Sequence, residues 1–137
     1  MKLQCTEEKL EKAIRLYGLA GVHEALKWFP MMSEPDYTRL CDSIKRHGYA
    51  EPVVITPDGY ILDGRARLCA SIEEHITLDA PVERLDPVDP VQYIASVNLF
   101  RQHLTPRQIK QVEKEAKKHK AEERQKRELW KGLSENE

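Results

Sequence analysis

Long apolar runs are missing from this sequence. No stretch approaches the roughly 20 consecutive apolar residues that a helix needs to cross a bilayer. The first residues, MKLQCTEEKL, carry acidic side chains where a secretory signal peptide would be apolar. Both absences argue against the membrane-anchored and secreted classes of protein. We therefore expect a cytoplasmic location and no membrane partner.

Cysteine is scarce, and the ligand spacings of common metal sites are absent. The only cysteines are Cys5, Cys41 and Cys69. They are widely spaced, odd in number and without a CxxC pair, which argues against a disulfide framework and a zinc site. We expect three reduced thiols, two of them in the core. The histidines show no ligand spacing either, and the sequence has no internal repeats or low-complexity tracts.

Charge is unevenly distributed, although the net charge is only −1. Residues 107–131 hold ten Lys/Arg against five Glu, so this segment carries +5 and the rest of the chain −6. A basic segment on an acidic body indicates either a polyanionic partner such as DNA or a solvated helix face. The candidate nucleic-acid contacts are Lys110, Lys114, Lys117 and Lys118.

Apolar periodicity and turn residues predict alternating helices and strands. Helices are expected from Thr6 to about Tyr17, Val22 to Phe29, Ser33 or Asp36 to Gly48, after Gly64 to about His75, after Asp89-Pro90 and after Thr105-Pro106. Strands are expected over residues 52–56, 60–62 and 76–83, with the turn Pro57-Asp58-Gly59 between the first two. The first two helices either cap the core or form a helix-turn-helix that reads DNA.

The last helix has an interrupted apolar seam. Its positions at heptad spacing are Ile109, Val112, Ala116, His119, Glu123, Lys126, Trp130 and Leu133. A coiled coil needs an apolar seam sustained over three or four heptads, and this seam is polar in its middle. We expect a helix that docks at its first turns and projects into solvent, with Trp130 marking a self-association contact.

The most informative segment is ILDGRARLCA, residues 61–70, where a strand turns into a helix at Gly64. Glycine allows close approach of a ligand, and the free N–H groups and dipole of the first helical turn favour an anion. Arg65 and Arg67 add forked cationic donors that suit phosphate. These two positions are about 200° apart on a regular helix, so they converge only if Arg65 lies at the helix boundary. The alternative is a turn glycine with solvated arginines.

The order of the pieces resembles a known family. A helix ending in SIKRHG is followed by the strand EPVVIT, then by ILDGRARLCA, and later by VNLFRQHLTPRQ. Over residues 33–110 these segments resemble the ParB/sulfiredoxin superfamily, specifically the N-terminal domain of ParB-type partition proteins. Gly64 and Arg67 match the Gly-x-x-Arg box of that family. Asn98 and Arg101 match its Asn-x-x-Arg box, which leads into Leu-Thr-Pro.

The resemblance implies a small α+β domain with a short mixed sheet, N-terminal helices and a long C-terminal helix. It implies that the two boxes hold a nucleoside triphosphate, CTP or ATP, with Mg²⁺, and that the domain self-associates on DNA at the nucleoid. The implied phosphate contacts are Gly64, Arg65, Arg67 and Arg101, with Asn98 near the metal. The implied role is segregation of plasmid, phage or chromosomal DNA, or transcriptional regulation.

The expected organisation has three parts. Residues 1–30 form an N-terminal helical segment, residues 31–104 the ParB-like nucleotide-binding core, and residues 105–137 the long basic helix. Two positions depart from the family pattern: the first box reads Gly-Arg-Ala-Arg instead of Gly-Glu-Arg-Arg, and Val97 replaces the glutamate before Asn98.

The alternative function is an enzyme of the same superfamily. Some members resemble nucleotide-dependent kinases of small hydroxylated substrates such as serine, with an Asp-Gly-His-x-Arg loop that residues 63–67 approach. Asp63 would then be a general base or metal ligand, or otherwise a capping residue. A nuclease is also associated with the family, but the sequence shows no cluster of metal-binding carboxylates. Sulfiredoxin has a reactive cysteine directly after the glycine, where this chain has Arg65, while Cys69 falls on an apolar face typical of an inert core thiol.

Overall fold

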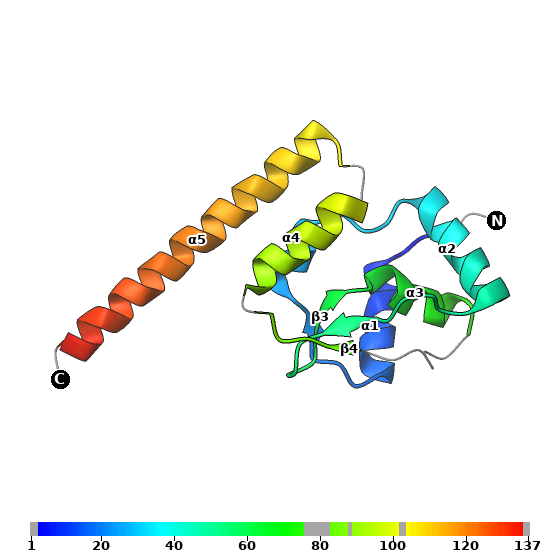
Figure 1. Cartoon of the computed structure of the whole chain (residues 1–137), viewed down its shortest axis with the longest axis horizontal. Helices are drawn as coiled ribbons and strands as arrows, with labels where there is room; N and C mark the ends of the chain where they lie inside the picture. Colours follow the sequence, from blue (N-terminus) through cyan, green and yellow to red (C-terminus); the bar gives the residue numbers. More distant parts are fainter. Residues whose placement is uncertain (1–2, 76–82, 88, 102–103, 136–137) are drawn as a thin grey trace. The chain divides into compact units, whose positions relative to one another are not determined.

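The computed structural model describes residues 3–75, 83–87, 89–101 and 104–135 (Figure 1). The chain divides into two compact units, Met1–Gln102 and His103–Glu137. The first unit is a small α+β domain, and the second consists of a long helix. The N-terminal helical segment expected at residues 1–30 belongs to the first unit, because its helix and strand pack on the elements that follow.

A short mixed sheet lies at the centre of the first unit. Its strands are β1 (Gly21–Val22), β2 (Val54–Ile55), β3 (Tyr60–Asp63) and β4 (Glu83–Arg84), in the order β1-β3-β2-β4. β3 runs parallel to β1 and antiparallel to β2, and β2 runs parallel to β4. The mixed sheet confirms that part of the expected fold.

The turn between β2 and β3 forms as the sequence predicts. The Gly59 N–H donates to the Thr56 carbonyl at 2.9 Å, and the Tyr60 N–H donates to the Thr56 hydroxyl oxygen, also at 2.9 Å. Gly59 has a φ of 94°, a left-handed backbone conformation that residues other than glycine rarely adopt. The hairpin therefore places β3 beside β2.

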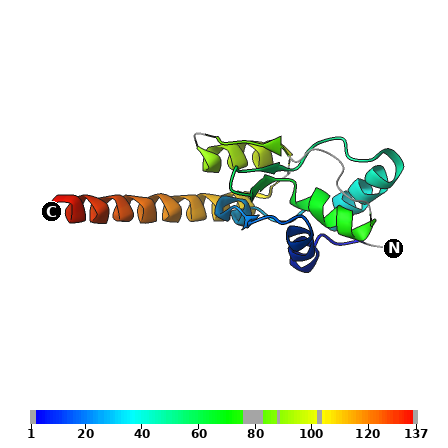
Figure 2. The same cartoon turned by 90° about the horizontal axis from the view of Figure 1, so that it is seen from below.

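Helices cover the sheet and close the core. They are α1 (Glu7–Leu16), the 3₁₀ helix η1 (Glu24–Trp28), α2 (Glu34–His47), α3 (Arg65–Glu73) and α4 (Pro90–Arg101). α3 packs against α1 and α2, and α4 packs against η1 and β3. Figure 2 shows α4 and α1 on opposite sides of the sheet.

Local capping explains where several helices begin and end. The Thr6 hydroxyl accepts a hydrogen bond from the Lys9 N–H at 3.3 Å, and the Asp89 carboxylate accepts one from the Gln92 N–H at 3.1 Å. Gly48 ends α2 with a φ of 78°. These boundaries agree with the sequence prediction, since caps depend on residues only three positions apart.

The predicted helix from Val22 to Phe29 is wrong at its start. Val22 is in β1, paired with Ile61 of β3, and only Glu24–Trp28 is helical. Since a strand separates α1 from η1, the two do not form a helix-turn-helix. A short apolar run does not by itself distinguish a helix from a buried strand, and here pairing with β3 decided the conformation.

The strand expected at residues 76–83 is only partly testable. Its residues 76–82 lie outside the described part of the chain, and Glu83 is the first residue of β4. The main-chain partner of this strand is β2, with Val54 opposite Glu83.

The second unit is α5 (Pro106–Glu135), which confirms the long C-terminal helix. A reciprocal capping box begins it: the Gln108 N–H donates to the Thr105 hydroxyl at 3.2 Å, and the Thr105 N–H donates to the Gln108 side chain at 2.9 Å. No helix in the described ranges has the length and apolarity that crossing a membrane requires.

Candidate anion-binding site

The candidate site begins at the junction of β3 and α3. Gly64 is the N-cap of α3 and has the left-handed angles φ 111° and ψ 20°. A Cβ at this position would lie 3.0 Å from Val53 Cγ2 and 3.1 Å from Val53 Cα. The glycine is therefore required by its own backbone conformation and by contact with the chain preceding β2. Helix N-termini in general can bind an anion through the N–H groups of their first turn.

Arg65, the first residue of α3, holds a distant loop. Its guanidinium donates to the Phe29 carbonyl at 3.2 Å and to the Pro30 carbonyl at 3.1 Å. Burial lowers the pKa of Arg65, with opposing contributions from Cys5, Cys69 and Asp63. An arginine side chain nevertheless remains protonated at neutral pH. Arg65 is a fixed positive charge tied to the segment after η1.

Arg67 points to a different part of the fold. Its guanidinium donates to the Pro52 carbonyl and lies 3.3 Å from an Asp63 carboxylate oxygen and 3.5 Å from a Glu51 carboxylate oxygen. Its side chain is 12% exposed. The two guanidinium groups thus bind separate loops and do not converge on one point in this structure. Arg65 does lie at the helix boundary, which was the condition for convergence, but its side chain turns toward a different loop from that of Arg67.

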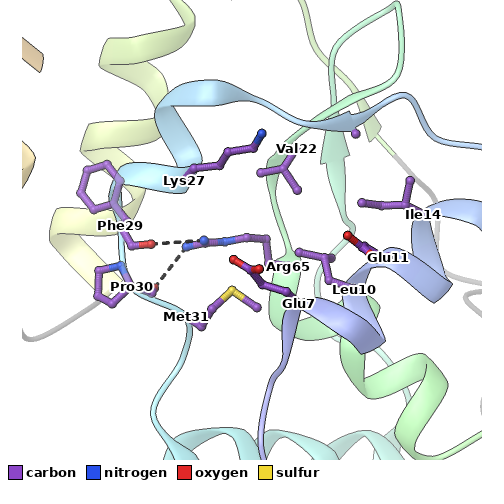
Figure 3. A pocket seen from close by; sticks show the side chains of 11 residues that line it. Glu7, Leu10, Glu11, Ile14, Val22, Lys27, Phe29, Pro30, Met31 and Arg65 are labelled. Carbon is purple, nitrogen blue, oxygen red and sulfur yellow. Dashed lines mark hydrogen bonds between the residues drawn. The ribbon is translucent and has the colours of Figure 1, made fainter. Parts of the chain in front are cut away.

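A cavity of about 590 Å³ lies beside Arg65, between α1, β1 and the chain from η1 to Met31 (Figure 3). Its size falls in the range of small-molecule sites. Its apolar lining residues are Leu10, Ile14, Val22, Phe29, Pro30 and Met31, and its charged residues are Glu7, Glu11, Lys27 and Arg65. The cavity therefore combines an apolar wall with two cations and two carboxylates.

The sequence did not indicate Lys27, Glu7 or Glu11 as site residues. No motif surrounds Lys27, and the acidic first turn of α1 is typical of ordinary helix capping. Only the packing of α1 and η1 around Arg65 brings these charges to one cavity. Lys27 lies in a short apolar run, and nothing in that run indicates a binding residue.

Asn98 and Arg101 both belong to α4. Asn98 is 6% exposed, and its side-chain amide donates to the Ile94 carbonyl at 2.8 Å. The amide oxygen of Asn98 is the atom that could serve a metal. The side chain of Arg101 lies outside the described residues. Asp63, the candidate general base, has its carboxylate paired with Arg67.

A protein-held metal site is not evident in the described ranges. They contain no group of three or more His, Cys, Asp or Glu side chains arranged to hold an ion. Mg²⁺ dehydrates reluctantly and is commonly held by nucleotide phosphates, waters and one or two protein oxygens. Such a site fits the residues present only if the nucleotide supplies most of the ligands.

The four candidate lysines of α5 share one face of that helix. Lys110, Lys114, Lys117 and Lys118 are exposed. At about 100° per residue, they fall within a stripe roughly 100° wide. Such a stripe can follow a phosphate backbone, and it equally suits a solvated helix.

Two of the three thiols, those of Cys5 and Cys69, lie close enough to affect each other. Cys41 and Cys69 are buried, as expected for core thiols, whereas Cys5 is half-buried. The Cys69 thiol donates to the Thr6 carbonyl at 3.6 Å. A hydrogen bond from Cys69, together with the positive charges of Arg65 and Lys9, lowers the pKa of Cys5 against the effect of burial. The same contact and burial raise the pKa of Cys69.

No protein-family model, curated protein or solved structure matches this chain. The resemblance to ParB-type domains therefore stays a prediction that depends on the boxes at Gly64–Arg67 and Asn98–Arg101. The geometry of the cavity and of α5 is independent of that resemblance.

Proposed function

We propose that this protein is a ParB-like module that binds a nucleoside triphosphate with Mg²⁺ and acts on DNA, in segregation or transcriptional control. The observation that carries the proposal is the cavity beside Arg65, which has the size of a small-molecule site and a fixed guanidinium on its wall. The order of the sequence boxes supports the choice of a nucleotide among possible ligands.

The lining of the cavity suits a ligand with an apolar ring and a charged end. Leu10, Val22 and Phe29 supply surface for a base, and Lys27 and Arg65 supply charge for phosphates. Glu7 and Glu11 would repel a bare triphosphate at the same cavity. Binding is therefore expected to require Mg²⁺, which neutralises part of the phosphate charge.

The two arginines differ in this proposal. Arg65 already lies on the cavity wall, whereas Arg67 would contact a phosphate only after leaving Asp63 and Glu51. We expect Arg65 and Lys27 to determine affinity and Arg67 to stabilise the β3–α3 junction. The resemblance alone would instead give a phosphate contact to Arg67 as well as to Arg65.

Nucleotide binding is tested by thermal unfolding with CTP, ATP, GTP and ADP, each with and without Mg²⁺. A ligand at 100 times its dissociation constant adds about 2.7 kcal/mol to the free energy of unfolding. We expect stabilisation by one or more triphosphates only with Mg²⁺, and its loss in Lys27→Met. Lys45→Met, an exposed lysine near the end of α2, is the matched control. No stabilisation by any of the four nucleotides contradicts the proposal.

DNA binding is tested separately, with a labelled duplex and fluorescence anisotropy. Replacing Lys110, Lys114, Lys117 and Lys118 by glutamine is expected to weaken binding and to reduce its salt dependence. Each phosphate contact contributes a slope of about −0.9 to log K against log salt. The control replaces Lys12 and Lys45, which are exposed in the first unit. Binding that is absent at low salt, or unchanged in the quadruple variant, contradicts a role for α5 in DNA contact.

A further inference from the structure

One face of α5 carries a seam whose pattern of apolar and polar residues is the same in both chain directions. Eight positions follow a regular 3-4 spacing: Ile109, Val112, Ala116, His119, Glu123, Lys126, Trp130 and Leu133. The apolar residues lie at the two ends of the seam, and the ionisable residues lie between them. The seam occupies the face opposite the lysine stripe, at about 100° per residue.

The ends of this seam include large apolar side chains exposed to solvent. Trp130 is 71% exposed, Leu133 63% and Ile109 36%, and Leu129 beside the seam is 67% exposed. Exposed Trp and Leu in one helical turn are typical of a surface that is covered by a partner. The ionisable residues in the middle of the seam, His119, Glu123 and Lys126, then determine which partner surface can pair with it.

A parallel pair of α5 helices would bring identical residues together. Glu123 would face Glu123 of a second copy, and Lys126 would face Lys126, so both central layers would place like charges in contact. A parallel arrangement is therefore disfavoured by the residues that interrupt the seam.

An antiparallel pair centred on Ala121 matches every layer with a different residue. Ile109 then faces Leu133 of the second copy, Val112 faces Trp130, Ala116 faces Lys126, and His119 faces Glu123. Each layer pairs an a position of one helix with a d position of the other, which is the arrangement of antiparallel coiled coils.

The chemistry of the four layers is complementary. Val112 is small enough to accept the Trp130 ring, and the aliphatic stem of Lys126 can cover Ala116 while its ammonium reaches water. His119 already lies 3.1 Å from Glu123 within the helix, so two copies would place His119 and Glu123 alternately around the two-fold axis. The polar middle, which excludes an extended apolar coiled coil, is thus compatible with this one register.

We propose that α5 binds α5 of a second copy of this chain as an antiparallel pair centred on Ala121. The lysine stripes then lie on the two outer faces of the pair, where they remain available to a polyanion. This pairing does not depend on nucleotide binding or on the resemblance to ParB-type domains.

Sedimentation equilibrium of the full chain tests whether the pair forms. We expect a dimer whose dissociation constant rises at least tenfold in Trp130→Ala and in Leu133→Ala. Leu16→Ala is the matched control, because Leu16 is 65% exposed on α1 in the other unit. A monomer at all concentrations, or equal dimerisation in all four proteins, overturns the proposal.

Spin labels test the orientation. In a Cys5→Ser background, which leaves only the two buried thiols, single cysteines are introduced at Arg107 and at Ala121, both outside the seam. Antiparallel pairing separates the two copies of residue 107 by about 42 Å along the axis and brings the two copies of residue 121 level with each other. We expect a long distance for the first and a short one for the second. Equal distances at both positions overturn the antiparallel register.

Discussion

The two units of this protein use their charged residues in different ways. In the first unit, Arg65 and Arg67 donate to main-chain carbonyls of loops far away in the sequence. The side chain of Arg67 is 12% exposed, and Arg65 is half-buried. In α5, lysines such as Lys114 and Lys118 are exposed on one helix face. An arginine beside a glycine turn is therefore not by itself a ligand contact, because a folded domain can use the same donors to fasten its own loops.

The largest expected difference between the units concerns glycine. Gly64→Ala places a Cβ against Val53 at a left-handed backbone position, and we expect a loss of about 3 kcal/mol in the free energy of unfolding. Gly132 lies inside α5 with open space around it. We expect Gly132→Ala to stabilise the helix by up to about 1 kcal/mol and so to raise its helicity.

Urea unfolding measures the first change, and circular dichroism at 222 nm measures the second. A loss of stability in Gly64→Ala together with a gain in Gly132→Ala would support the contrast between a packed junction and a solvated helix. A neutral Gly64→Ala would show that the β3–α3 junction relaxes easily, and the proposed need for glycine there would be wrong.

A smaller difference is expected for the cations. Arg65→Met removes two donors and leaves the Phe29 and Pro30 carbonyls without them, which we expect to cost about 2 kcal/mol. Lys118→Met on the exposed face of α5 should change stability by no more than about 0.5 kcal/mol. Urea unfolding midpoints compare the two variants. Equal effects would contradict the structural role assigned to Arg65.

The smallest predicted effect is on thiol chemistry within the first unit. Because the hydrogen bond from Cys69 is the main cause that lowers the pKa of Cys5, more Cys5 thiolate is present at neutral pH than in a free thiol. Iodoacetamide should label Cys5 first, and Cys69→Ala should slow that labelling several-fold at pH 7. The difference should disappear at high pH, where the Cys5 thiol is ionised in both proteins. Cys41→Ala is the control, and mass spectrometry of the labelled peptides is the measurement.

The cap-defined parts of the fold could be predicted from sequence because capping acts over three or four residues. Thr105-Pro106 predicted the start of α5, and Ser33 or Asp36 with Gly48 predicted the limits of α2, where the structure selects Ser33 as the N-cap. The turn at Gly59 was equally local. In contrast, the sequence pattern predicts a helix at Val22, because the partner that makes it a strand, Ile61 of β3, is almost 40 positions away along the chain.

The candidate site was predictable only as a set of residues. The sequence placed Gly64, Arg65 and Arg67 at the start of a helix, and that placement holds. It did not indicate that Arg65 would lie beside Lys27 in a cavity formed by α1 and η1, while Arg67 would turn toward Glu51.

The sequence by itself determined the helix limits, the hairpin turn, and a long basic helix whose seam is apolar at both ends. Those features depend on side chains close together in the chain, where backbone preferences and capping act. Only the tertiary structure decided the direction of each arginine, because a guanidinium takes the acceptors that packing brings within reach. The carbonyls of Phe29, Pro30 and Pro52 become such acceptors only after the sheet and helices have assembled.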